Sequence, residues 1–201
     1  MKPVIMLAGG SASLGDGVYT RAARDFGRLL AREGWTLRTG GGSGDCIMGA
    51  AADGALEAGG RVEGVILRRF WRVRHRGLHV MRAYRTFALR KAALFRGAAA
   101  AVIFPGGYGT LDELGDLLTL RQTGILGIPI IVVDTAGFYR GLVAWDRRAE
   151  RDGFLYGGRL FRLARTPRQA LRLLRSLLHT KEAPIVPGGR APERAARSRR
   201  Q

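Results

Sequence analysis

The sequence predicts an α/β protein with a single domain, built on an open parallel β-sheet flanked by helices. Short apolar segments alternate with longer amphipathic segments, which is the pattern of repeated βαβ units. The chain has 201 residues, 46% of them apolar, a length that fills one such domain but is cramped for two. Glycine clusters follow two of the apolar segments, as they do at strand-to-helix junctions that bind phosphates.

The N-terminal half of the chain gives the clearest elements. Phe26 and Leu30 recur at helical spacing, and Gly34 ends that helix. We expect strands at Val4–Ala8, Trp35–Thr39 and Val62–Leu67, and helices at Val18–Glu33 and Ile47–Ala58.

The C-terminal half begins with a segment, 68–96, that holds ten Arg or Lys residues and no acid. Only its end, Thr86–Arg96, predicts a helix. Residues 1–180 are expected to form the Rossmann-like domain, and residues 181–201, rich in Pro, Gly and Arg, a basic disordered tail. Further strands are expected at Ala99–Phe104 and Ile128–Asp134, and helices at Thr110–Gln122, Phe138–Arg151 and Thr166–His179.

Charge and composition limit the class of protein. The formal net charge is +18, nearly all from arginine, which we interpret as a solvated basic surface, although it would also attract nucleic acid. Cys46 is the only cysteine, which excludes an intramolecular disulfide and a cysteine-based zinc site. No apolar stretch reaches the roughly 20 residues that a bilayer requires. We therefore expect a cytoplasmic protein that has no membrane association.

Neither a metal nor a cofactor is expected. His75 and His79 stand four residues apart, a spacing that suits a metal on a helix, but Gly77 argues against a helix there. No third ligand accompanies them in the sequence.

The two glycine clusters indicate a phosphate ligand. The first, Thr39–Gly44, follows the second predicted strand, and the second, Pro105–Gly109, follows the fourth. At such junctions free backbone N–H groups and the positive end of the helix dipole point at one spot, and glycine lets the ligand approach closely. The first cluster is neither a dinucleotide fingerprint nor a P-loop, which argues against hydride transfer and ATP hydrolysis.

A longer motif around the second cluster is more specific. The chain is similar to the Lonely Guy family, the cytokinin riboside 5′-monophosphate phosphoribohydrolases, many of which were once labelled lysine decarboxylases. The similarity runs from about Val4 to Leu178, and an Arg-Lys pair on the preceding helix, Arg90-Lys91, is its other half. The family's PGGxGTxxE motif is matched by Pro105-Gly106-Gly107-Tyr108-Gly109-Thr110-Leu111-Asp112-Glu113.

This resemblance implies a homodimer that hydrolyses a nucleoside 5′-monophosphate to free base and ribose 5-phosphate. It assigns catalysis to Arg90 and Glu113, a pairing that suits the chemistry, since a carboxylate can stabilise positive charge on ribose and orient water. Arginine stays protonated at any relevant pH. The phosphate and the rest of the substrate would be bound by Ser11, Gly41, Gly42, Lys91, Gly106, Gly107, Gly109 and Thr110.

Several alternatives remain open. Thr110 and Glu113 have the spacing of a helix capping box, which needs no ligand. The same scaffold could serve as a non-hydrolytic nucleotide or molybdenum-cofactor carrier. The acid-free segment 68–96, with interleaved Phe70 and Trp71, could instead bind nucleic acid, the less favoured partner. That segment also lacks the acid with which the family usually contacts the base, so the choice between cytokinin and adenine nucleotides stays open.

Overall fold

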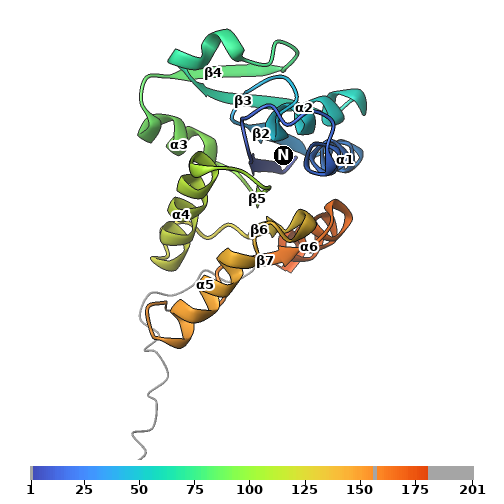
Figure 1. Cartoon of the computed structure of the whole chain (residues 1–201). Coiled ribbons are helices and arrows are strands. Elements are labelled where there is room, and N and C mark those ends of the chain that lie inside the picture. The colour runs from blue at the N-terminus through green and yellow to red at the C-terminus, as the bar shows by residue number, and fades with distance from the viewer. Residues whose placement is uncertain (1, 156–157, 181–201) are drawn as a thin grey trace, which may run out of the picture.

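The computed structural model describes residues 2–155 and 158–180, and it confirms the predicted α/β fold (Figure 1). All strand pairs in the described sheet are parallel, and the strand order is β4-β3-β2-β1-β5-β6-β7. The strands are β1 Val4–Ala8, β2 Thr36–Thr39, β3 Val62–Leu67, β4 Val80–Tyr84, β5 Ala100–Ile103, β6 Ile130–Val133 and β7 Arg162–Ala164.

Helices cover both faces of the sheet. Helices α1, α2 and α6 pack on one face, and α3, α4 and α5 pack on the other. Two short 3₁₀ helices, η1 (Arg68–Val73) and η2 (Thr135–Gly137), follow β3 and β6. The α-helices are α1 Val18–Arg32, α2 Ile47–Glu57, α3 Phe87–Phe95, α4 Tyr108–Gln122, α5 Arg140–Arg151 and α6 Pro167–Thr180.

The central strands are apolar along their whole length because both faces are covered. In β1, Ile5 and Leu7 point into the core under α1 and α2, while Met6 and Ala8 point into the core under α3 and α4. All four are fully buried. Burial of each larger side chain contributes about 1.5–3 kcal/mol, and continuous apolar strands of this kind are typical of parallel sheets.

Two strands were missed by the sequence analysis. β4 is an edge strand, only half buried, whose apolar pattern is interrupted by the exposed Arg82. β7 has only three residues, too few for a visible period. The predicted start of the last helix is confirmed, because the Gln169 amide donates to Thr166 Oγ1 at 3.2 Å. The predicted tail, 181–201, lies outside the described residues.

The strand order reverses direction at the centre of the sheet. β1 pairs with β2 on one side and with β5 on the other. β1 and β2 lead into α1 and α2 on one face of the sheet, whereas β5 leads into α4 on the opposite face. A crevice at the carboxyl ends is expected at such a point. No helix in the described part of the chain is long and apolar enough to span a membrane.

Candidate active site

A cavity of about 690 Å³ lies at the carboxyl ends of the central strands. We call one wall the glycine side; it comes from the loop after β1 and from the start of α4, and it includes Gly10, Ser11, Gly107, Gly109 and Thr110. We call the opposite wall the aromatic side; it comes from the end of β3, from η1 and from α3, and it includes Ile66, Leu67, Phe70, Val73 and Phe87.

The glycines of the second cluster have two different tasks. A Cβ on Gly106 would lie 2.1 Å from Thr110 Oγ1 and 2.7 Å from the amide nitrogen of Gly10, so the packing of the two loops requires glycine there. A Cβ on Gly107 or Gly109 would meet nothing within 4 Å. Because both also line the cavity, their missing side chains leave room for a ligand at the N-terminus of α4.

The glycine side is held firmly from behind. The Gly10 amide donates to the Pro105 carbonyl at 2.9 Å, which ties the loop after β1 to the loop after β5. The hydroxyl of Tyr139 donates to the Phe104 carbonyl at 2.7 Å and fixes the end of β5. The backbone amides at the start of α4 are therefore held in place, with their orientation set by packing rather than by a ligand.

The first glycine cluster lines only part of the cavity, and it also makes space for a residue of the site. Gly41 has a φ of +76°, which favours glycine, but its backbone does not line the cavity, whereas Gly42 does. A Cβ on Gly40 would lie 2.4 Å from Nη2 of Arg90, so glycine at this position makes space for that guanidinium. The cluster thus positions Arg90 as well as shaping the wall.

Arg90 and Glu113 form a buried ion pair in the wall between the two sides. Nη1 of Arg90, on α3, donates to Oε1 of Glu113, on α4, and Nε donates to the Val65 carbonyl at 3.1 Å. Their side chains are 11% and 8% exposed. Burial lowers the pKa of Arg90 to about 10, so the guanidinium is still protonated at neutral pH. Removing one member of such a pair costs about 3–5 kcal/mol, because the other charge stays buried.

The capping-box interpretation of Thr110 and Glu113 is wrong. α4 begins two residues earlier than predicted, with Gly107 as the N-cap, and the Thr110 amide donates to the Gly107 carbonyl at 3.0 Å. The carboxylate of Glu113 is turned toward Arg90 instead of back to Thr110. Glu113 therefore points at the cavity for a reason other than helix capping.

Lys91, which the resemblance assigns to substrate binding, lies away from the cavity. Its Nζ contacts Asp112 at 2.9 Å and Asp116 at 2.6 Å, so it joins α3 to α4, and it does not line the cavity. Ser11 and Thr110, by contrast, do line it. Cys46 is the N-cap of α2, with Sγ accepting from the Gly49 amide at 3.3 Å.

The aromatic side was not predicted as a wall of the site. Phe70 and Phe87 keep 42% and 56% of their surface exposed although both line the cavity. Backbone hydrogen bonds hold the wall, since the Ser43 amide donates to the Val73 carbonyl at 3.2 Å and the His75 amide donates to the Gly41 carbonyl at 2.8 Å. His75 itself is hydrogen-bonded to Asp53 at 2.8 Å, and no cluster of metal ligands exists among the described residues.

Comparison with known proteins shows the family of this chain. A family described as possible lysine decarboxylase matches residues 48–174. A cytokinin riboside 5′-monophosphate phosphoribohydrolase of Rhodococcoides fascians is 31% identical over 140 residues, which cover 68% of this chain and 70% of that protein. The chain belongs to the Lonely Guy family. A Lonely Guy enzyme of the same name from Arabidopsis thaliana is 34% identical over 139 residues, 68% of this chain and 64% of that protein.

Solved structures show that the Lonely Guy fold is shared with other proteins. The molybdenum cofactor binding protein of Rippkaea orientalis has a TM-score of 0.68 and 22% identity, covering 89% of this chain and 98% of that one. The molybdenum cofactor carrier protein of Chlamydomonas reinhardtii also has a TM-score of 0.68 and 22% identity, covering 90% and 99%. At such identity the likeness shows the fold alone.

Proposed function

We propose that this protein hydrolyses the N-glycosidic bond of nucleoside 5′-monophosphates, yielding free base and ribose 5-phosphate. The observation that carries the proposal is the buried Arg90–Glu113 pair in the cavity wall, next to the open N-terminus of α4. A buried ion pair in a cavity wall is costly to desolvate, and it is expected where charges act on a ligand. Relatives named for this reaction support the assignment.

The 5′-phosphate would bind on the glycine side. The first amides of α4 have no acceptor within the helix, and the helix dipole adds partial positive charge at the same place. Gly107 and Gly109 leave open space there, and the Thr110 side chain lines it. This arrangement can bind an anion without a lysine, which agrees with the position of Lys91 away from the cavity, between α3 and α4.

The bond to be broken would lie beside the Arg90–Glu113 pair. As the base leaves C1′, positive charge develops on the ribose, and the Glu113 carboxylate can stabilise it. Glu113 also orients and deprotonates the water that attacks C1′. The hydroxyl stays on ribose 5-phosphate, and the proton reaches the leaving base. Arg90 holds the carboxylate in place through its own bonds to Glu113 and to the Val65 carbonyl.

The base would lie against the aromatic side. Phe70 and Phe87 offer ring faces for stacking, and Leu67 and Val73 offer apolar contact. Among the lining residues the only carboxylate is Glu113, which is paired with Arg90. We infer that the base is held by stacking and apolar contact, so that the site accepts AMP as well as the cytokinin nucleotides named for the relatives.

The test is product identification. The protein is incubated with AMP, other nucleoside monophosphates and the matching nucleosides, and free base and ribose 5-phosphate are quantified by chromatography. We expect equimolar products from the monophosphates, and release that is about 10²–10⁴-fold slower from Glu113→Gln. If the monophosphates bind and no base is released from any of them, the hydrolase assignment is wrong and a non-hydrolytic carrier takes its place.

Two further expectations stay predictions. The resemblance implies a homodimer, which light scattering of the purified protein measures directly. The cytoplasmic location is also a prediction, and localisation of a tagged form of the protein in cells tests it.

A further inference from the structure

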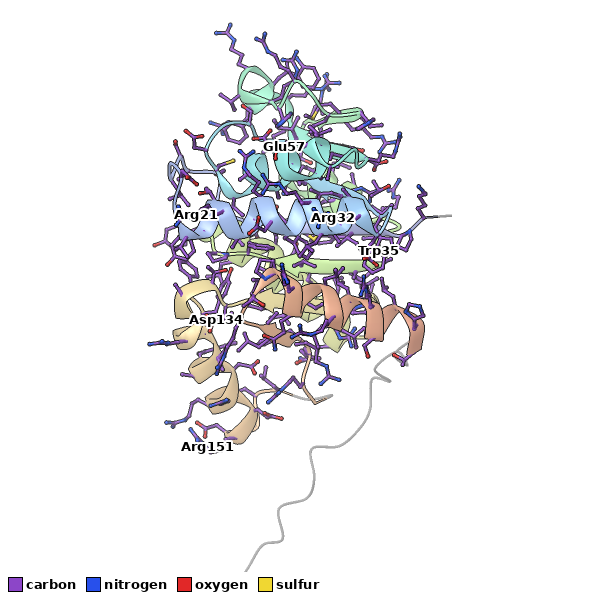
Figure 2. All side chains as sticks on the ribbon, turned by 90° about the vertical axis from the view of Figure 1, so that its right-hand side faces the viewer. Arg21, Arg32, Trp35, Glu57, Asp134 and Arg151 are labelled. Atoms are coloured by element: carbon purple, nitrogen blue, oxygen red, sulfur yellow. The ribbon has the colours of Figure 1, made fainter. Side chains whose placement is uncertain are left out.

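A second surface stands out in the segment 68–85, which we call the arginine arm. It comprises η1, the loop after it and the edge strand β4, and it contains seven arginines and no acid. η1 buries none of its residues. Side chains ending in nitrogen project from this end of the molecule into solvent, at the top of Figure 2.

The arm differs from other arginine-rich surfaces of the protein in its lack of counter-charges. On α1, Arg21, Arg24 and Arg28 all form ion pairs with acidic side chains. On the arm, Arg82 lies 3.8 Å from Glu63, but no described acidic side chain is within 4.0 Å of Arg68, Arg69, Arg72, Arg76 or Arg85. No acidic side chain among the described residues offsets the mutual repulsion of these five arginines. This favours an external anion as their partner.

Aromatic rings lie between these cations. Trp71 is 39% exposed and Phe70 42% exposed. The guanidinium of Arg74 lies 4.2 Å from the centre of the Trp71 ring, and that of Arg69 lies 5.1 Å from the centre of the Phe70 ring. Exposed rings beside cations are the arrangement with which proteins bind single strands, because bases stack on the rings while phosphates contact the charges.

We propose that the arginine arm binds single-stranded nucleic acid. The proposal does not depend on the hydrolase activity, since neither the arginines involved nor Trp71 lines the cavity; of the two rings only Phe70 belongs to both surfaces. A duplex groove is usually read by a helix or a two-stranded ribbon, and an anionic membrane surface by an amphipathic helix. The six-residue η1 and the single edge strand β4 provide neither, whereas a flexible single strand can follow an irregular surface.

The experiment measures binding of a fluorescent oligothymidylate by anisotropy at several salt concentrations. The test variant carries Arg68→Gln, Arg69→Gln and Arg72→Gln. A matched control carries Arg21→Gln, Arg148→Gln and Arg175→Gln, which removes the same charge from exposed arginines that have acidic partners. We expect the control to bind like the wild type and the arm variant to bind about 10–100-fold more weakly. Its salt slope should fall by about 2, for three fewer phosphate contacts.

Trp71 separates nucleic acid from other polyanions. Trp71→Ala should weaken oligothymidylate binding about tenfold while leaving heparin binding unchanged, and Trp71→Phe should retain most of the affinity. Circular dichroism confirms that each variant is folded. Equal losses in the arm and control variants would overturn the proposal, as would a lack of oligonucleotide binding at low salt. Arm-dependent binding to anionic vesicles without oligonucleotide binding would assign the surface to membranes instead.

Discussion

The glycine side of the cavity presents backbone atoms, whereas the aromatic side presents side chains. On the glycine side the backbone faces the cavity, and Gly107 and Gly109 present no side chain at all. On the aromatic side large side chains face it, and Phe70 and Phe87 remain half exposed. Backbone amides fixed by packing recognise one rigid anion, whereas exposed rings accept many flat partners. Under the proposed function, this comparison predicts that selectivity for the phosphate exceeds selectivity for the base.

The largest expected effect on rate comes from substituting Glu113, in the ion pair that lies between the glycine side and the aromatic side. Glu113→Gln should slow base release from AMP about 10²–10⁴-fold, because one positioned proton acceptor and its charge are lost. AMP affinity, measured by calorimetry, should change little, because the phosphate binds elsewhere. Asp116→Asn is the matched control, since Asp116 lies on the same helix, contacts Lys91 at 2.6 Å and does not line the cavity. Equal losses in both variants would remove Glu113 from the reaction.

Two glycine substitutions sharpen the description of the glycine side. Gly109→Ala should weaken AMP binding about 10–10²-fold, because the new methyl group displaces the phosphate by about an ångström. Its thermal stability should stay the same or rise, since alanine is favoured within a helix. Gly106→Ala should lower stability by about 1–3 kcal/mol, because its Cβ meets Thr110 and Gly10. A Gly109→Ala protein with unchanged KM would place the phosphate elsewhere.

The aromatic side is tested by truncating one ring. Phe87→Ala should raise KM about tenfold for AMP, GMP and CMP alike, because stacking contributes about 1–3 kcal/mol whatever the base. Phe87→Leu, which keeps apolar contact, should raise it less. If the wild type discriminated among these bases by more than about 10⁴, the site would have to contain hydrogen-bonding groups specific to one of them.

The smallest expected effect concerns pH. Because burial lowers the pKa of Arg90 to about 10 from an ordinary 12.5, the protonated guanidinium predominates below pH 10 and is lost above it. The value of kcat/KM for AMP should therefore be halved near pH 10 and fall as pH rises further, whereas an ordinary arginine would give no fall there. Circular dichroism at the same pH checks that the fold persists.

Part of this architecture could be predicted from the sequence. The central strands were clear because strands such as β1 and β6 are buried on both faces and apolar throughout. The catalytic candidates were predicted through the motif that ends at Glu113, and the structure brings Arg90 into contact with it across 23 residues of chain. Neither periodicity nor spacing alone would have paired these two side chains.

The remainder depends on tertiary contacts. The aromatic side was missed because Phe70 lies in an irregular segment whose path is set by contacts with Gly41 and Ser43, far away in the sequence. Lys91 follows Arg90 directly, yet α-helical geometry turns the two side chains apart, one to the cavity and the other to Asp112. Local sequence does not decide which member of such a pair faces a site.

The most direct test of the central claim is the ratio of kcat/KM for AMP to that for adenosine in one preparation of wild-type protein. The two substrates share the base and the ribose, so the ratio isolates the contribution of the glycine side. The account predicts a ratio of about 10² or more, because a charge-assisted phosphate contact is lost with adenosine and the substrate is no longer oriented. Equal values for the two substrates would contradict it.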